Sequence, residues 1–161
     1  MKSSLVHFPE TITTPRLLLR APRVRDALAL NDAIHESFVS LHHWMPWARE
    51  KPTLQETLDY VRESAARYRR REDFPILLWE RESEEFVGAS GLHPRDWSVP
   101  SFEIGYWLRS STVGKGYITE AVEALTQAAF QHLHAERIII RCDSRNVRSA
   151  RVAERAGYTL E

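Results

Sequence analysis

The chain has 161 residues, 43% hydrophobic and 27% charged, a composition that suits one globular domain with its own core. Its 22 basic and 22 acidic residues balance, which argues against nucleic acid as the main partner, because phosphate binding requires an excess of Lys and Arg. The single cysteine cannot form an internal disulfide, and no apolar run approaches the roughly 18 residues of a membrane helix. We therefore expect a single cytoplasmic domain over residues 1–161, with neither nucleic acid nor membrane as a partner.

The N-terminal half predicts one strand and two helices. The apolar run at residues 15–20 is typical of a strand, and apolar residues follow helical spacing across residues 24–34. Residues 37–52 are rich in Trp and His and look irregular. Thr53 and Glu56 have the spacing of a capping box, which predicts that the second helix begins here.

The C-terminal half predicts a meander followed by alternating helices and strands. Three short β-rich runs are expected to pair antiparallel: residues 74–79, 85–91 and 102–108. A helix over residues 117–133, a strand over 137–142 and a helix over 147–156 follow, and then an extended segment from Tyr158.

The predicted fold class is α+β, with the element order β-α-α-β-β-β-α-β-α-β. Asn146 is expected to cap the last helix and Gly157 to end it. Cys142, at the end of the predicted strand, is interpreted as a small core residue.

A glycine-containing loop opens directly into the helix at Tyr117. Gly114 and Gly116 can adopt backbone angles that other residues avoid, and the first turn of a helix presents unpaired amides and a positive dipole end. Together with Lys115 these features suit a diphosphate, although an ordinary strand-to-helix turn has the same local pattern. The P-loop pattern is absent, and Thr119 breaks the dinucleotide fingerprint.

Two blocks taken together resemble the GNAT superfamily of acyl-CoA-dependent N-acetyltransferases: GKGYITEA at residues 114–121 and NVRSARVAERAGY at residues 146–158. With GYWL at residues 105–108, the spacing is most similar to the RimJ/RimL-type branch, over about residues 14–161. The resemblance implies a GNAT fold with a mixed, mostly antiparallel sheet flanked by helices. Related chains continue for one more strand, so the resemblance implies a domain truncated at its C-terminus.

The resemblance implies acetyl-CoA as the cofactor, with its diphosphate on the loop and its pantetheine arm along the strand that precedes the loop. Ser111 stands where the family usually carries Gln or Arg, and Arg109 is the cation that would take its place. The implied cofactor-binding residues are Tyr106, Trp107, Leu108, Arg109, Val113, Gly114, Lys115, Gly116, Tyr117, Ile118, Asn146 and Ser149.

Transfer to an amine requires the neutral amine. An α-amino group with a pKa of about 7.7–8.0 is roughly 10–17% neutral at pH 7, whereas a lysine is neutral in only about one molecule in 2,500. An α-amine therefore needs only a weak base or a water relay.

Glu103 is the candidate base, directly or through water, because it faces away from the neighbouring apolar residues of its strand; a salt-bridged glutamate is the alternative. The resemblance implies that Ser149 donates a proton to the leaving sulfur. Backbone amides near residues 106–108 are the expected oxyanion donors.

The segment with two indoles provides candidate acceptor contacts. His43, Trp44 and Trp47 either line a substrate groove with Glu103 or anchor the loop on the domain. His42 and His43 do not form a convincing metal pair, and no metal is predicted. The expected acceptor is the α-amine of a protein N-terminus or a small-molecule amine, a non-catalytic acyl-CoA-binding domain is the other class, and a homodimer stays open.

Overall fold

The computed structural model describes residues 6–161, and within them the strands form one six-stranded sheet in the order β1 to β6. All neighbouring strands pair antiparallel except β5 and β6, which are parallel. The strands are β1 (Thr11–Thr13), β2 (Leu17–Arg20), β3 (Phe74–Glu80), β4 (Phe86–Asp96), β5 (Ser101–Leu108) and β6 (Arg137–Ile140). Residues 1–5 of the predicted domain lie outside the described residues.

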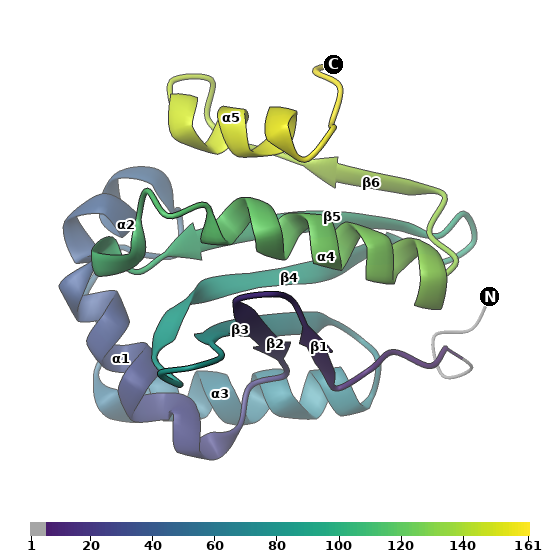
Figure 1. Cartoon of the computed structure of the whole chain (residues 1–161). Helices are drawn as coiled ribbons and strands as arrows, with labels where there is room; N and C mark the ends of the chain where they lie inside the picture. Colours follow the sequence, from purple (N-terminus) through teal and green to yellow (C-terminus); the bar gives the residue numbers. More distant parts are fainter. Residues whose placement is uncertain (1–5) are drawn as a thin grey trace.

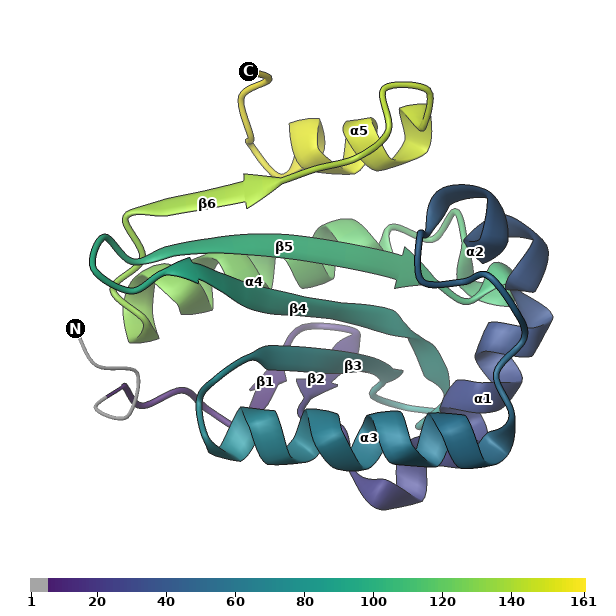
Figure 2. The same cartoon turned by 180° about the vertical axis from the view of Figure 1, so that it is seen from behind.

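Five α-helices of the described chain cover the two faces of this sheet (Figures 1 and 2). They are α1 (Ala27–Glu36), α2 (Phe38–Trp44), α3 (Leu54–Arg69), α4 (Tyr117–His132) and α5 (Val147–Arg155). Short 3₁₀ turns at Val24–Asp26 and Ser110–Thr112 precede α1 and follow β5. Across residues 6–161, no helix combines the length and apolar character needed to cross a bilayer.

The sheet separates two apolar cores. One face packs on α4 through Phe102 and Ile104, and the other packs on α1 and α3 through Leu77 and Phe86. Strand β3 contributes to both faces, which explains its nearly continuous apolar sequence. Each fully buried Leu or Phe contributes roughly 1.5–3 kcal/mol, so the two cores hold β3, β4 and β5 as a rigid frame.

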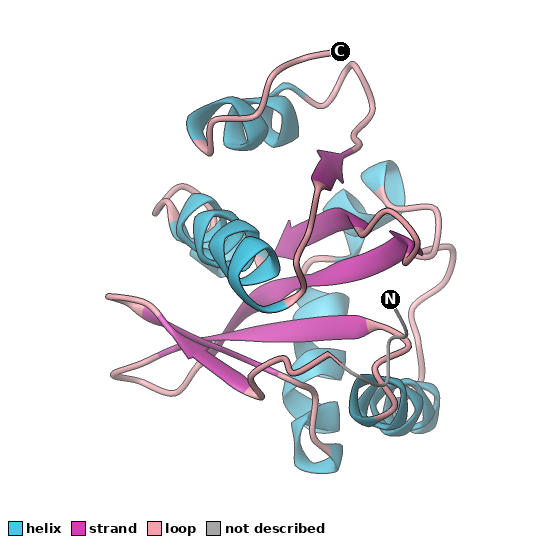
Figure 3. Ribbon diagram, turned by 90° about the vertical axis from the view of Figure 1, so that its right-hand side faces the viewer, coloured by secondary structure: helices cyan, strands magenta, loops and turns pink. Residues whose placement is uncertain are grey.

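Strands β5 and β6 stop pairing before β5 ends. Their pairing stops at Ile104 and Ile140, while β5 continues to Leu108. The last four residues of β5, 105–108, therefore pair with β4 on one side and extend beyond β6 on the other. Figures 2 and 3 show β6 diverging from β5 toward α5.

The predicted α+β class and most of the predicted elements are confirmed. The capping box of α3 and the residues predicted to cap and end α5 are confirmed as well. The Thr53 hydroxyl accepts from the Glu56 amide at 3.1 Å, and the Glu56 carboxylate accepts from the Thr53 amide at 3.1 Å. Asn146 caps α5, and Gly157 follows that helix in the left-handed region with φ of 88°.

Three predictions of local structure were wrong, those for residues 37–52, for the end of β4 and for the segment from Tyr158, and strand β1 was not predicted. Residues 37–52 contain α2, which buries only Leu41 and so has no apolar periodicity to reveal it. Strand β1 is half exposed and carries no apolar alternation, and β4 continues through a bulge near Pro94 to Asp96 instead of ending at residue 91. The segment from Tyr158, predicted to be extended, forms no strand and pairs with none of the described strands.

The interpretation of Cys142 as a core residue was also wrong, because its side chain is exposed. Strand β6 ends at Ile140, two residues earlier, so Cys142 lies where the chain has already left the sheet.

A buried ion pair joins β2 to the start of α1. The Arg20 guanidinium donates two hydrogen bonds to Asp26, at 2.7 and 2.8 Å, and both residues are less than a tenth exposed. Arg20 also stacks over the Trp79 ring at 4.7 Å.

We expect Asp26→Ala to lower the free energy of unfolding by about 3–5 kcal/mol, because the Arg20 charge would stay buried without a partner. Glu72→Ala is the matched control, because it removes the partner of the exposed Arg70 and should cost less than about 1 kcal/mol. Urea denaturation followed by circular dichroism measures both values. Equal losses in the two variants would contradict the assignment of Arg20 and Asp26 as a buried structural pair.

Candidate active site

The loop between β5 and α4 has an unusual backbone. Gly114 and Gly116 have φ values of 84° and 78°, in the left-handed region that favours glycine. Gly116 is the residue that precedes α4, and no side chain caps this helix. The two glycines therefore allow the loop to adopt a backbone conformation that other residues would strain.

This backbone leaves a run of amides free. The first main-chain hydrogen bond of α4 joins the Glu120 amide to the Gly116 carbonyl at 3.2 Å. Within residues 6–161, the amides from Val113 to Thr119 donate to no other protein group. Free amides at the positive end of a helix are suited to an anion, so the geometry is compatible with the diphosphate site that the sequence predicts.

The side chains of this loop differ in their surroundings. Lys115 is exposed and Val113 is 41% exposed, whereas Tyr117 and Ile118 are buried in the α4 core. The side chains of Tyr117 and Ile118 therefore pack inside the protein, whereas Lys115 is an exposed cation of the loop.

The free end of β5 meets the first turn of α5. The Tyr106 hydroxyl donates to the Ser149 carbonyl at 2.7 Å, and the Ser149 hydroxyl lies 3.2 Å from the same phenol oxygen. The Asn146 side chain accepts from the Ser149 amide at 3.2 Å. Burial raises the pKa of Tyr106, so the phenol stays protonated at neutral pH. The structure thus brings together three residues that the sequence predicted from separate segments.

Glu103 lies nearer the start of β5, on the face opposite Phe102 and Ile104. Its carboxylate, 18% exposed, pairs with Arg95 and lies 3.9 Å from the Arg141 guanidinium. Tyr106 is three positions further along β5, about 10 Å away at the rise of a strand. The structure therefore does not place Glu103 in contact with Ser149, and it shows the ion pairs of the alternative interpretation.

Arg109 is committed to a neighbouring carboxylate. Its Nε lies 3.1 Å from each oxygen of Glu36, and the Ser111 amide and hydroxyl also donate to Glu36. Burial acts to raise the pKa of Glu36, but the hydrogen bonds from Ser111 and Arg109 hold it below its ordinary value. The cation predicted to replace the family's usual residue therefore already has an anionic partner.

The candidate acceptor residues lie around the end of α2. A cavity of about 570 Å³ is lined by His43 and Trp44 among others, and the rings of these two residues are 4.2 Å apart. Trp47 is 52% exposed, with its ring 6.2 Å from that of Trp107 on β5. Trp107 and Glu103 share a strand face, so the structure places these aromatic residues on the Glu103 side of the sheet.

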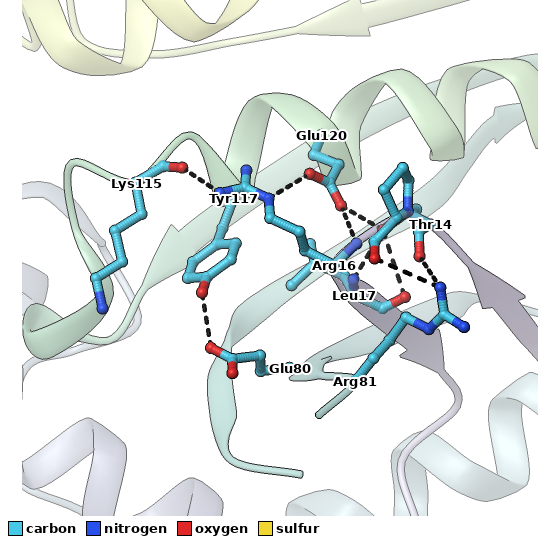
Figure 4. Close-up of polar contacts among 9 residues, drawn as sticks. Thr14, Arg16, Leu17, Glu80, Arg81, Lys115, Tyr117 and Glu120 are labelled. Carbon is cyan, nitrogen blue, oxygen red and sulfur yellow. Dashed lines mark hydrogen bonds and ion pairs between the residues drawn. The ribbon is translucent and has the colours of Figure 1, made fainter. Parts of the chain in front are cut away.

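Sequence reasoning missed the residues that support the loop from the turn between β1 and β2. Figure 4 shows Thr14 and Arg16 reaching Glu120 in the first turn of α4. Figure 4 also shows Tyr117 donating to Glu80 on β3, at 2.7 Å. Only the polar triplet before a strand, TPR at residues 14–16, marked this turn, and nothing in it pointed to a loop a hundred residues away.

Residues 16–159 match the acetyltransferase (GNAT) domain family, which is nearly the whole chain, and the chain therefore belongs to that family. Its enzyme class is N-acetyltransferase with acetyl-CoA as the acyl donor, as the resemblance implied. The free amides and the open end of β5 fit such a donor, because they offer partners for its diphosphate and its extended arm.

Relatives agree on the branch. The chain is 27% identical over 151 residues to the uncharacterized N-acetyltransferase YnaD of Bacillus subtilis (strain 168), covering 93% of this chain and 83% of that one. It is 34% identical over 80 residues to the ribosomal-protein-serine acetyltransferase of Escherichia coli (strain K12), covering 50% and 45%. A solved structure of RimL, described as a ribosomal L7/L12 alpha-N-protein acetyltransferase in complex with coenzyme A, has a TM-score of 0.87 at 25% identity, covering 94% and 85%. These likenesses support the RimJ/RimL-type branch.

We expect Gly116→Val to abolish binding of CoA while leaving the chain folded, because a β-branched side chain disfavours the left-handed backbone that exposes the amides. Gly157→Val is the matched control, with the same kind of strain at φ of 88° beyond the end of α5. Calorimetric titration with CoA measures binding, and circular dichroism checks the fold. Unchanged affinity in Gly116→Val would reject the assignment of this loop.

Proposed function

We propose that the protein transfers acetyl from acetyl-CoA to the α-amine of a protein N-terminus. The observation that carries the proposal is the free main chain from Val113 to Thr119 in a chain so similar to RimL, a protein named for α-N-acetylation. The ribosomal-protein-serine acetyltransferase among the relatives supports the same class of acceptor. An N-terminus of this kind is met in the cytoplasm, the location that the sequence predicts.

The donor site is built from two segments. The loop amides from Val113 to Ile118, with Lys115, would hold the diphosphate, because they combine free N–H groups with a positive helix end. The free side of β5 from Tyr106 to Leu108 would hold the pantetheine arm by strand-like pairing, and Asn146 at the start of α5 would add a contact to it.

Acetyl-CoA supplies the acetyl group as a thioester: a bond from the amine nitrogen to the carbonyl carbon forms, and the carbon–sulfur bond breaks. Unpaired amides at the end of β5 are the groups that would stabilise negative charge on the carbonyl oxygen. Ser149 is the group that would give a proton to the departing sulfur, and its hydroxyl is already oriented by Tyr106. The Tyr106 phenol donates to the Ser149 carbonyl and accepts from the Ser149 hydroxyl, so it holds the first turn of α5 against β5.

Glu103 would accept the proton that the amine loses, through a water molecule. Its carboxylate is held by Arg95 and lies 3.9 Å from the Arg141 guanidinium. A weak base suffices for an α-amine, which is roughly 10–17% neutral at pH 7. The acceptor would approach from the side of the sheet that carries Trp107, past His43, Trp44 and Trp47.

We expect rapid thiol release from acetyl-CoA with a peptide that begins with a free Ser or Ala. The control peptide has the same sequence with a blocked N-terminus and an internal Lys, and it should react about 250-fold more slowly, because so little of its amine is neutral. Mass spectrometry locates the acetyl group. Turnover with amino acids or polyamines but not peptides would assign a small-molecule acceptor, and no turnover in a chain that binds CoA would indicate a binding domain.

We expect Glu103→Gln to lower kcat by about 10²-fold at pH 6–7 and less at pH 9, where more of the α-amine is already neutral. Glu72→Gln is the control, because it changes an ion-paired glutamate outside the candidate site. Rates over pH 6–9 with a saturating peptide measure the effect. Full turnover of Glu103→Gln across that range would show that Glu103 serves only its ion pairs.

A further inference from the structure

An ion pair joins the turn before β2 to the first turn of α4. The Arg16 Nε donates to Glu120 Oε1 at 2.8 Å, and the Arg16 amide donates to Oε2 at 3.0 Å. The Thr14 hydroxyl donates to the same Oε2 at 2.5 Å. Glu120 is thus held on both oxygens by residues more than a hundred positions away (Figure 4).

Arg16 also reaches the glycine loop itself. Its Nη1 donates to the Lys115 carbonyl at 2.7 Å, and a Cβ placed on Gly116 would lie 3.4 Å from its Nη2. The guanidinium stacks over the Tyr117 ring at 4.6 Å, and Tyr117 is in turn bound to Glu80. One planar group therefore contacts Lys115 and Tyr117 and lies beside Gly116 between them.

The contact with Lys115 determines the direction of an amide. The Lys115 carbonyl and the Gly116 N–H belong to one planar trans peptide, in which they point in opposite directions. Because Arg16 draws the carbonyl toward β2, the Gly116 N–H is directed away from it, to the side where no protein group accepts. Glycines on both sides of Lys115 make this peptide easy to rotate, so a fixed direction requires an external hold.

Arg16 also neutralises a charge that would oppose an anionic ligand. Glu120 lies in the first turn of α4, beside the proposed diphosphate seat. Burial acts to raise its pKa, but the hydrogen bonds from Thr14 and Arg16 lower it, so the carboxylate is ionised at neutral pH. Without Arg16, that negative charge would stand unpaired at the end of the helix that favours anions.

We propose that Arg16, anchored by Glu120 and Thr14, is a positioning residue that holds the loop of residues 113–118 in its diphosphate-binding conformation. The inference rests on the donor site of the proposed function. A purely structural ion pair would affect folding and every ligand alike. If Arg16 positions the loop, its substitution should lower the affinity only for ligands that carry the diphosphate.

The test compares Arg16→Lys with Arg70→Lys. Lysine keeps the charge next to Glu120, so the chain should fold, but it lacks the planar fork that reaches Glu120 and the Lys115 carbonyl together. Arg70 holds Glu72 by a similar fork on the exposed end of α3, so the same substitution there is the matched control.

Calorimetry with CoA and with pantetheine, which lacks the diphosphate, gives the binding readout. We expect Arg16→Lys to weaken CoA about tenfold and to leave pantetheine unchanged, as the loss of one charge-assisted hydrogen bond predicts. In turnover, KM for acetyl-CoA should rise by a similar factor at constant kcat. Arg70→Lys should match the wild type in every measurement.

Three outcomes would overturn the inference. Unchanged CoA affinity in Arg16→Lys would show that the loop holds its conformation alone, and equal weakening of CoA and pantetheine would show a general structural effect. A wild-type chain that binds no CoA would overturn the proposed donor site as well, whereas the first two outcomes leave that site standing.

Discussion

The site depends on main-chain groups that the fold leaves without partners. The N–H groups from Val113 to Thr119 have no acceptor among the described residues, so they are available to water or to a ligand. The same holds for the end of β5, where pairing with β6 stops after Ile104. These two sets of unpaired main-chain groups lie along the end of β5 and in the loop that follows it. Together they match a ligand with an extended arm and a diphosphate.

Packing in the rest of the molecule prevents these main-chain groups from finding partners within the protein. The apolar cores on the two faces hold β3, β4 and β5 in register, so the end of β5 cannot shift to find another partner. Tyr117 and Ile118 anchor the first turn of α4 in one of those cores while their amides remain outside it. Ser149 and Tyr106 bind each other across the opening, which ties α5 to β5 where the strands have separated.

Local sequence signals predicted most of the fold and part of the site. The capping box at Thr53, the Asn146 cap and the positive-φ glycines were recoverable because each is a short-range requirement of the backbone. Helix α2 and strand β1 were not, since neither buries enough side chains to impose a period. The ion-pair partners of Glu103, Arg109 and Glu120 could not be predicted from the sequence for a different reason. Strand pairing and helix packing bring these partners together from distant parts of the chain. The family resemblance indicated acetyl-CoA as the donor and a diphosphate-binding role for the loop between β5 and α4. The spacing of the glycines alone left that role ambiguous.

One consequence follows from the alternation of side chains along β5. Phe102, Ile104 and Tyr106 point to the sheet face that packs on α4, whereas Glu103 and Trp107 point to the opposite face, where Trp107 packs against the core formed with α1 and α3. The side chains proposed to contact the acceptor and those proposed to contact the donor would thus lie on opposite faces of β5. If His43, Trp44 and Trp47 contact the acceptor as proposed, substitutions there would change which amine is selected and leave the proposed acetyl-CoA contacts in place. One fold could then serve different acceptors with the same donor.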